Sequence, residues 1–269
     1  MTLIGVLGRG AVGRAVSGRL TDCGFTVRAA DRDDRRHVLD AEPDVLITAL
    51  TRGDESLRQL GELEWAPGFV LDFTTQSPES AWRCARQAAA LGAAYHGGGL
   101  TGGGRELALG QGVLLLGSPV DPDGPAGRVV SALGRAIGFP SAPEAAKAKL
   151  LHNWVLLVQQ WSAALALGEA GPDGADALVE VLAAGTAGRA VPEWSVVRDA
   201  RGPARSTYLG RLAAKDLGEI ARGLPALAEA GGPVLDMLTE ALLAGAEQPY
   251  TQTLLNILDG AGNGPKEAL

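Results

Sequence analysis

The chain has 269 residues, enough for one large domain or two ordinary ones, and 46% of its residues are hydrophobic while 20% are charged. A formal net charge of −7 argues against nucleic acid or an anionic membrane as the main partner. Met1 leads directly into an apolar segment without a signal-peptide pattern, and no apolar run is long enough to span a bilayer. We therefore expect a cytoplasmic protein that binds neither nucleic acid nor membrane.

The first 140 or so residues alternate short apolar runs with helical stretches. The apolar runs predict strands at Leu3–Leu7, Phe25–Ala30, Val45–Leu50, Phe69–Phe73, Ala93–His96 and Val113–Gly117. Helical spacing predicts helices at Val12–Asp22, Asp54–Leu63, Glu79–Leu91 and, after three prolines, about Gly127–Ile137. Continuous apolar strands separated by helices are typical of a parallel-dominated sheet covered on both faces.

From about Pro143 onward the pattern is helical. The longest predicted helix, Glu144–Ala170, is apolar around most of its circumference, so it should be buried on nearly all sides. Because a second subunit often completes such burial, we expect a homodimer. Further helices are predicted at about Ala175–Ala184, Pro192–Asp199, Ser206–Glu229, Pro233–Ala244 and Thr251–Leu258. The sequence therefore predicts an α/β domain over residues 1–143 and an all-helical domain over residues 144–269.

The cysteines and histidines indicate no metal site. Cys23 and Cys84 have no motif spacing and are expected to be reduced core thiols. The three histidines, His37, His96 and His152, are too scattered to suggest metal ligands. We expect a protein without a bound metal.

A glycine-rich turn follows the first predicted strand. Gly8, Gly10 and Gly13 form G-x-G-x-x-G between a strand and a helix, the setting in which this pattern binds a dinucleotide of the NAD(P) type. The first glycine permits the tight turn, the second lets the backbone approach a pyrophosphate, and the third lets the helix pack on the strand. The alternative is an ordinary glycine-rich turn. The expected contacts of the cofactor are Gly8, Arg9, Gly10, Ala11, Val12 and Gly13.

The end of the second predicted strand bears on the choice between NAD and NADP. Asp31 stands where a carboxylate would accept the ribose 2′-hydroxyl of NAD. Asp33 and Asp34 add negative potential that would repel a 2′-phosphate. Against this, Arg32, Arg35 and Arg36 could clamp that phosphate. The balance favours NAD, with Asp31 and Arg32 as the expected contacts.

Lys149 is the best candidate for a chemical residue. Lysine accounts for four of the 24 Lys and Arg residues, and a lysine can exchange a proton where arginine stays charged. Asn153 follows at i+4 and faces the same side of the helix, so it can orient a substrate oxygen. The alternative is a surface lysine with a snorkelling stem, which better describes Lys147.

Three motifs together resemble the β-hydroxyacid dehydrogenases, which include 3-hydroxyisobutyrate and 6-phosphogluconate dehydrogenases and are related to the imine reductases. Asp72–Pro78 resembles the D-x-S-T-x-x-P segment, Lys149–Asn153 the K-x-x-N-N helix motif and Lys215–Leu217 the K-D-L segment. The resemblance covers about residues 3 to 245. It implies a Rossmann domain followed by an all-α domain, dimerisation and an active site in the cleft between the domains.

The resemblance also implies roles for individual residues. Thr74 and Thr75 would line the nicotinamide end of the cofactor site, and Lys149 would be the catalytic acid and base. Lys215 would lie near the cofactor and substrate, with a helix-surface salt bridge to Glu219 as the alternative. His152 replaces the first Asn of the helix motif.

A glycine-rich stretch, residues 95–104, occupies the position of the family's D-A-P-V-S-G-G substrate loop. There a hydroxyl and successive backbone amides hold a substrate carboxylate, and the resemblance assigns that role to Thr101, Gly102 and Gly103. Gly97 and Gly99 stand in place of the motif's Asp and Pro. The stretch can also be aligned with imine reductases, and a turn without a ligand role is the third alternative.

Three functions are therefore compatible with the sequence. The leading one is an NAD(P)-dependent dehydrogenase acting on a hydroxy acid or related carbonyl compound, with Lys149 as general acid and base. An imine or iminium reductase is the main rival, although such enzymes usually replace the catalytic lysine with Asp or Tyr. A non-catalytic dinucleotide-binding sensor is the rival from another class.

Overall fold

The computed structural model describes residues 2–31, 33–185, 208–250 and 253. Contacts divide the chain into two compact units. The first unit comprises residues 1–151 with Arg222–Leu224, and the second comprises residues 152–221 and 225–269. This division falls inside a long helix, eight residues beyond the predicted boundary between residues 143 and 144, which stays a prediction.

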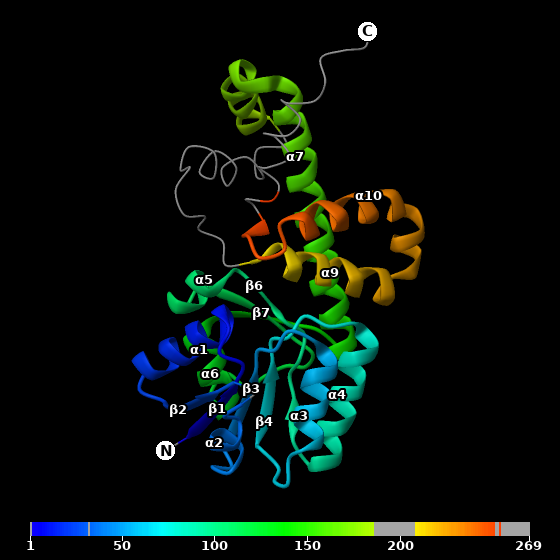
Figure 1. Ribbon diagram of the computed structural model, residues 1–269. Helices are drawn as coiled ribbons and strands as arrows, with labels where there is room; N and C mark the ends of the chain where they lie inside the picture. The colour runs from blue at the N-terminus through cyan, green and yellow to red at the C-terminus, as the bar shows by residue number, and fades with distance from the viewer. Residues whose placement is uncertain (1, 32, 186–207, 251–252, 254–269) are drawn as a thin grey trace. The chain divides into compact units, whose positions relative to one another are not determined.

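The first unit is built on a five-stranded parallel sheet in the order β2-β1-β3-β4-β5 (Figure 1). Its strands are β1 (Leu3–Leu7), β2 (Thr26–Ala30), β3 (Val45–Thr48), β4 (Phe69–Asp72) and β5 (Ala94–Tyr95). From β1 the chain adds β2 on one side, and it then adds β3, β4 and β5 on the other, so the strand order reverses between β1 and β3. The carboxyl ends of these two strands form the switch point at which such sheets bind ligands. All five strands were predicted from their apolar runs.

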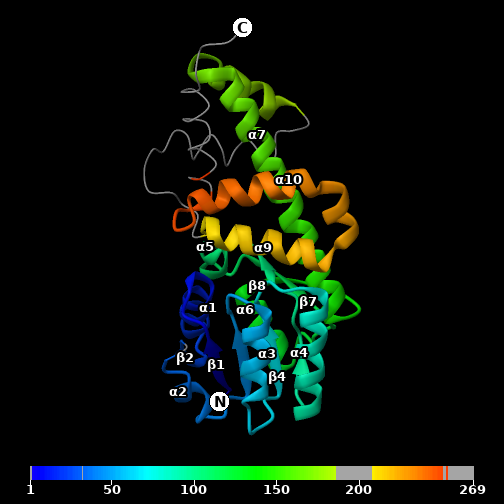
Figure 2. The same ribbon diagram turned by 45° about the vertical axis from the view of Figure 1, so that its right-hand side comes forward.

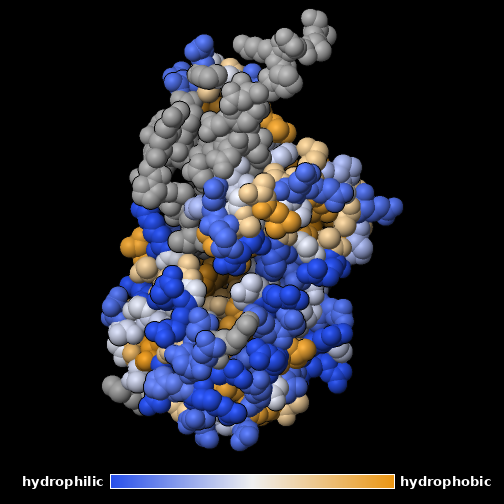
Figure 3. Space-filling model, in the orientation of Figure 1, coloured by the Kyte–Doolittle hydropathy of each residue, from blue (hydrophilic) through white to orange (hydrophobic). Residues whose placement is uncertain are grey.

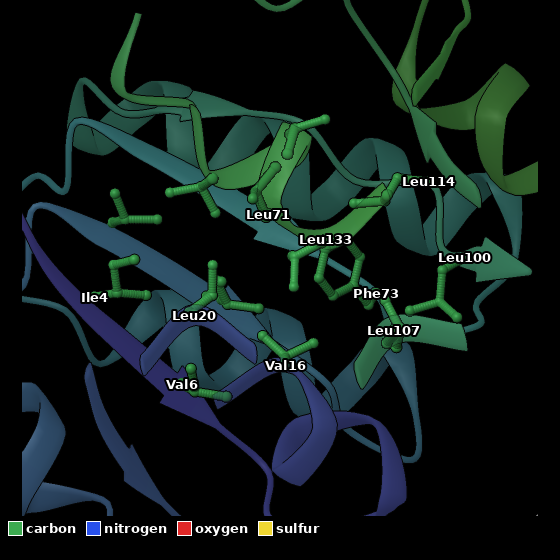
Figure 4. Packing of buried hydrophobic residues seen from close by; sticks show 14 of the residues in the cluster. Ile4, Val6, Val16, Leu20, Leu71, Phe73, Leu100, Leu107, Leu114 and Leu133 are labelled. Carbon is green, nitrogen blue, oxygen red and sulfur yellow. The ribbon is translucent and has the colours of Figure 1, made fainter. Parts of the chain in front are cut away.

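Helices cover both faces of this sheet, because successive side chains of each strand point to opposite sides. On one face, side chains such as Ile4, Val6 and Leu71 pack against α1 (Ala11–Asp22), α5 (Gly104–Ala108) and α6 (Pro125–Leu133), as Figure 4 shows. On the other face, Leu46 and Val70 pack against α2 (Arg36–Leu39), α3 (Gly53–Gly61) and α4 (Pro78–Leu91). Figure 2 shows α3 and α4 side by side in front of the sheet.

A second, three-stranded sheet corrects one predicted helix. Its order is β6-β7-β8, with β6 (Leu100–Thr101) antiparallel and β8 (Gly134–Gly138) parallel to β7 (Gly112–Leu116). The helix predicted at Gly127–Ile137 ends at Leu133, and the following residues form β8. Gly134 has a φ of 150°, which a helix cannot accommodate, and it pairs directly with Gly112.

The described part of the second unit is helical. The helix α7 (Ala142–Ala184) contains a non-helical residue, Gly171, between the two helices predicted there. The single helix predicted at Ser206–Glu229 is instead α9 (Gly210–Gly223) followed by α10 (Pro225–Ala244), which continues through Pro233. The chain breaks before Pro225 because proline disfavours helical geometry in the preceding residue. The helices predicted at Pro192–Asp199 and Thr251–Leu258 fall outside the described residues, apart from Thr253.

Hydrophilic and apolar residues are distributed differently on the surfaces of the two units. Hydrophilic residues dominate the visible surface of the first unit in Figure 3, while apolar residues gather over α10. Exposed apolar side chains on the second unit include Val155, Leu165, Val181, Met237 and Leu243. Within the described residues, no helix has the length and apolar character needed to cross a bilayer.

The two cysteines differ in exposure. Cys84 is buried on α4, as expected for a core thiol, but Cys23 is exposed, so the prediction for Cys23 was wrong. It directly follows α1 at the helix C-cap, where the chain turns at the surface. Burial, with a smaller contribution from Asp72, raises the pKa of the Cys84 thiol to about 12.

Candidate functional site

The glycine turn after β1 has the geometry that a dinucleotide requires. Gly8 has a φ of 102° and approaches the Ala49 carbonyl so closely that an added Cβ would lie 2.3 Å from its oxygen. An added Cβ at Gly13 would lie 1.7 Å from the Gly8 oxygen, so α1 packs directly on the turn. At Gly10, by contrast, an added Cβ would meet nothing within 4 Å. The second glycine therefore keeps space open in front of the α1 N-terminus, whose N–H groups favour an anion.

A pocket of about 210 Å³ lies beside this turn. It brings together Gly8, Arg9, Gly10 and Asp31, four of the residues predicted to contact the cofactor. Ala11, Val12 and Gly13 continue from it into α1. Arg32 lies outside the described residues. The lining fits the adenosine side of a dinucleotide, with a carboxylate at the end of β2.

The arginines around this pocket have acidic partners. Arg9 forms an ion pair with Asp34 at 3.2 Å, and the Asp34 carboxylate also accepts the backbone N–H of Asp31 at 2.6 Å. Arg35 pairs with Glu62 at 3.1 Å. The arginine charges near the end of β2 are therefore at least partly neutralised by the chain's own carboxylates.

Asp72, at the end of β4, organises the segment that contains Thr74 and Thr75. Its buried carboxylate accepts hydrogen bonds from the Thr74 backbone N–H at 2.9 Å, the Gln76 amide at 3.0 Å and the Tyr95 hydroxyl at 2.8 Å. Burial, and secondarily Asp72, raises the pKa of Tyr95 well above its usual value, so Tyr95 remains a donor. This network links the loop after β4 to the strand β5.

Thr74 joins the loops after β3 and β4. Its hydroxyl oxygen accepts the Leu50 N–H at 3.1 Å and the Ser56 hydroxyl at 3.0 Å, and Leu50 lines the pocket beside the glycine turn. Thr75 is half-buried in the same segment. Of the threonine pair predicted at the nicotinamide end, Thr74 is thus hydrogen-bonded to a residue of the pocket wall, and its side chain is fixed from the loop after β3 and from α3.

The glycine-rich stretch departs from the family's loop for two steric reasons. An added Cβ at Gly97 would lie 2.3 Å from the ring of Tyr95, so this ring fills the space an Asp would need. Gly99 has a φ of 93°, which proline cannot adopt, and an added Cβ there would lie 3.1 Å from Lys149 Cγ. An Asp at position 97 and a Pro at position 99 are therefore both incompatible with this backbone and its neighbours.

The expected carboxylate-binding residues lie just beyond. Thr101 ends β6, and Gly102 has a φ of 84°. The backbone N–H of Gly103 donates to the Glu106 side chain at 2.7 Å, and Glu106 belongs to the first turn of α5. One of the amides predicted to hold a substrate carboxylate therefore already binds a carboxylate of the chain.

Lys149 is buried in the first unit, with 9% of its surface exposed. Its stem packs against the glycine stretch at Gly99, while Lys147 is exposed on the same helix. Ala145 and Leu150, on the same helix, are completely buried. The description of a snorkelling surface lysine thus fits Lys147 and not Lys149.

In the second unit, Asn153 and Lys215 meet at one carboxylate. The Asn153 amide donates to Asp216 Oδ2 at 2.7 Å, and the Lys215 ammonium forms an ion pair with Asp216 Oδ1 at 2.5 Å. The Tyr208 hydroxyl also donates to Asp216. Sequence reasoning singled out neither Asp216 nor Tyr208 as a site residue, although an acidic residue directly after the candidate Lys215 was a usable signal.

No group of His, Cys, Asp or Glu side chains in the described part of the chain has an arrangement that could hold a metal ion. His96 is buried, with its Nδ1 2.7 Å from the Ser118 hydroxyl and its ring edge-on to Phe69. Burial lowers the pKa of His96, a shift partly offset by the Ser118 backbone, so the imidazole stays neutral further into the acid range.

No protein-family model and no curated protein matches the chain. Solved structures do match. The 3-hydroxyisobutyrate dehydrogenase of Mycobacterium tuberculosis, solved with L-serine, has a TM-score of 0.75 at 22% identity over 96% of this chain and 99% of that chain. The enzyme of the same name from Salmonella typhimurium has a TM-score of 0.75 at 19% identity over 96% of this chain and 100% of that one. The chain has the fold of the β-hydroxyacid dehydrogenases.

A reductive aminase from Aspergillus terreus, solved with NADPH and ethyl levulinate, matches less closely. Its TM-score is 0.59 at 19% identity over 96% of this chain and 99% of that chain. These matches confirm the predicted fold class, an α/β domain with a parallel-dominated sheet followed by a helical region. At such identities the likeness concerns the fold, so the choice of chemistry depends on this chain's own residues.

Proposed function

We propose that the chain is an NAD(P)-dependent oxidoreductase that uses Lys149 to exchange the proton accompanying hydride transfer. The main support for a bound dinucleotide is the open space at Gly10, which lines the same pocket as Asp31. The proposed substrate is a small hydroxy or carbonyl compound. When bound, a nicotinamide dinucleotide supplies or accepts the hydride.

Lys149 has the chemistry that the proton step requires. Reduction of a carbonyl leaves a developing alkoxide, and an ammonium group within reach both stabilises that charge and donates a proton. In the oxidative direction the amine removes the proton. Burial beside Gly99 limits water around the Lys149 stem, and Asn153 follows one helical turn later on α7 to orient a substrate oxygen.

We further propose that NAD is preferred to NADP. Asp31 lines the pocket where the ribose 2′-hydroxyl would be accepted, and Arg9 and Arg35 are engaged with Asp34 and Glu62. A 2′-phosphate would have to compete with these carboxylates. Titration of the chain's tryptophan fluorescence with NADH and NADPH checks this: the dissociation constant for NADH should be at least about tenfold lower. Tighter binding of NADPH would contradict the preference.

A spectrophotometric screen tests the proposed reaction. NADH and NADPH are offered with β-keto acids, semialdehydes and cyclic imines. On the substrate that turns over, Lys149→Ala should lower kcat by about 100-fold or more, because general acid catalysis is lost. Lys147→Ala is the matched control, since Lys147 is exposed on the same helix and should leave the rate unchanged.

The other outcomes separate the rival functions. Imine reduction that is unaffected by Lys149→Ala would exclude the proposed mechanism. Dinucleotide binding without turnover on any class would support a sensor.

One observation favours a substrate without a carboxylate, such as an imine or a neutral ketone. Glu106 occupies the Gly103 N–H, and its side chain lies against Gly102 and Gly103, so it brings a negative charge to this loop. Glu106→Ala should therefore improve kcat/KM for a β-keto acid relative to its methyl ester by about tenfold, because a hydrogen bond to a charged group becomes available. An unchanged ratio would show that the loop does not contact this part of the substrate.

A homodimer formed through the helical unit is a separate proposal. Val155 and Leu165 on α7, with Met237 and Leu243 on α10, are exposed apolar side chains that a second subunit would cover. Sedimentation velocity over a range of concentrations should give twice the mass of one chain, and the mass of a single chain throughout would contradict the proposal.

A further inference from the structure

Three donors of the second unit meet at the carboxylate of Asp216. Asp216 lies on α9 with 3% of its surface exposed. Its Oδ2 accepts from the Asn153 amide and the Tyr208 hydroxyl, and its Oδ1 pairs with the Lys215 ammonium. Asn153 comes from α7, 63 positions earlier in the chain, and Tyr208 lies just before α9. The cluster therefore ties three separate segments to a single charged group.

A carboxylate buried to this degree needs such partners. Burial of a charge is costly unless it is paired and hydrogen-bonded. Lys215 supplies the opposite charge, and the Asn153 and Tyr208 donors satisfy the second oxygen. Removing one partner would leave the others with an imperfectly compensated charge, so the geometry of the four groups is mutually dependent.

The cluster determines which way the Asn153 amide faces. An ionised carboxylate only accepts hydrogen bonds, so Asn153 must turn its NH₂ group toward Asp216. Its Oδ1 then lies on the side of His152, whose Nδ1 is 3.1 Å away. Since Oδ1 is an acceptor, His152 carries its hydrogen on Nδ1 in this arrangement. The orientation follows from the chemistry of the partners and does not depend on telling nitrogen from oxygen.

Tyr208 is held for this role by the chain around it. Its carbonyl accepts the Tyr250 N–H at 2.8 Å, and the two aromatic rings pack edge-to-face with centroids 5.2 Å apart. Burial, with Asp216 as the second cause, raises the pKa of Tyr208 well above its usual value. Tyr208 therefore keeps its proton and donates to Asp216 over the whole working range of pH.

We propose that Asp216 is a positioning residue that fixes the amide of Asn153 and the ammonium of Lys215, and that Tyr208 holds the Asp216 carboxylate in place. This proposal rests on the proposed function, which gives Asn153 a substrate contact and Lys215 a contact with the cofactor or substrate. Asp216 acts through these two side chains and does not itself exchange the proton.

A double-mutant cycle tests the route through Asn153. Asp216→Asn keeps the shape of the side chain but removes its charge and can turn an NH₂ group toward Asn153. It should lower kcat by about 10-fold or more, whereas in the Asn153→Ala background the same change should cost less than about threefold, as expected for coupled neighbours. Tyr208→Phe, which keeps the ring contact with Tyr250, should show a smaller loss of kcat in the same direction.

Thr253→Val is the matched control for a structural effect. It removes another buried hydrogen bond of the second unit, the one from the Thr253 hydroxyl to the Gly245 carbonyl. Asp216 takes no part in that hydrogen bond. The substitution should lower the unfolding midpoint by an amount comparable to Tyr208→Phe while leaving kcat unchanged. Equal losses of kcat in Thr253→Val and Asp216→Asn would overturn the positioning role, and additive losses in the cycle would overturn the route through Asn153.

A measurement without turnover separates this proposal from the proposed function. In ¹⁵N-labelled protein, the two Asn153 side-chain amide protons should be widely separated in chemical shift and slow to exchange, and Asp216→Asn should bring them together. If the wild type reduces none of the substrates, the proposed function fails while this spectrum still decides the Asp216 contact. Amide resonances that Asp216→Asn leaves unchanged would overturn the contact even in an active enzyme.

Discussion

At the scale of single residues, the three glycines of the turn after β1 serve different physical needs. Gly13 is required by the fold, since the space of its missing Cβ is taken by the Gly8 carbonyl. At Gly10 the space for a Cβ has no neighbour within 4 Å, so packing among the described residues does not require a glycine there. The open space at Gly10 is consistent with the proposed dinucleotide, whose pyrophosphate would approach the backbone there.

Substitutions at these two positions should therefore separate stability from binding. Gly13→Ala should lower the free energy of unfolding by about 3 kcal/mol through overpacking, whereas Gly10→Ala should change it by less than about 1 kcal/mol. Gly10→Ala should nevertheless weaken NADH binding by at least about tenfold, because the methyl group obstructs the pyrophosphate. Urea unfolding and fluorescence titration measure the two effects.

Gly18→Ala is the control for this comparison, since Gly18 is exposed on α1 and an added Cβ there meets nothing within 4 Å. It should leave NADH binding unchanged. Undiminished NADH binding by Gly10→Ala would place the dinucleotide elsewhere.

His96 should make stability depend on pH in a defined range. Its pKa is lowered in the folded chain, mainly by burial, from an ordinary value of 6.5. As the pH falls through that ordinary value, the unfolded chain binds a proton before the folded chain does, so folding becomes less favourable. The contribution is fully present above about pH 7.5 and is lost on acidification, with a slope of up to about 1.4 kcal/mol per pH unit.

Comparison with His96→Gln isolates this effect. Urea unfolding midpoints measured from pH 8 to pH 5 should fall more steeply in the wild type than in the variant, since all other titrating groups are shared. Parallel curves would mean that His96 titrates alike in the folded and unfolded chains.

The residues of the candidate site were predictable to different degrees. Lys149 and Asn153 lie four positions apart in a helical pattern, so the sequence alone indicates that they share a face. Asp216 reaches Asn153 across 63 positions, and only packing of α7 against α9 creates that contact. The sequence also could not predict that the Tyr95 ring excludes a side chain at position 97. That exclusion depends on where a hydrogen bond to Asp72 directs the ring.

At the scale of elements, the boundary between α6 and β8 depends on one residue. Gly134 combines a φ of 150° with a close approach to Gly112, whose oxygen would lie 2.0 Å from an added Cβ. Gly138 ends the same strand, and an added Cβ there meets nothing within 4 Å. The two glycines of β8 therefore differ in whether the sheet needs them.

Gly134→Ala should destabilise the chain by about 3 kcal/mol, from backbone strain and overpacking, while Gly138→Ala should change stability by less than about 1 kcal/mol. Chemical unfolding followed by circular dichroism measures both variants. Equal stability of the two variants would show that the strand tolerates a side chain at Gly134.

Three of the correctly predicted strands share a property. The strands β1, β3 and β4 are continuous apolar runs, because both of their faces are covered by helices. In contrast, β8 has four exposed residues and no apolar run, and β6 has two residues inside a glycine-rich stretch. Elements stabilised by their neighbours, with little pattern of their own, were the ones that sequence reasoning missed.

At the scale of the whole molecule, cofactor binding should stabilise the chain unevenly. The proposed dinucleotide pocket is lined entirely by residues of the first unit. NADH at 100 times its dissociation constant should stabilise the folded form by about 2.7 kcal/mol, which corresponds to a rise in Tm of roughly 5–10 °C. If calorimetry resolves two transitions, only the one that belongs to the first unit should move.

Gly10→Ala should abolish most of this rise at the same NADH concentration, and Thr253→Val should retain it. A rise of equal size in Gly10→Ala would indicate that the dinucleotide stabilises the chain from another site.

The packing of Tyr95 and Lys149 around the glycine-rich stretch restricts the order in which mutations can accumulate. An Asp at position 97 collides with the Tyr95 ring, and a Pro at position 99 meets both a forbidden φ and the Lys149 stem. Neither change is accessible while its neighbours are unchanged, and replacing Tyr95 first removes a donor from buried Asp72. Directed evolution toward the dehydrogenase loop should therefore require simultaneous changes. Libraries of single substitutions should not recover the Asp or the Pro, because each is tolerated only after its neighbours have changed.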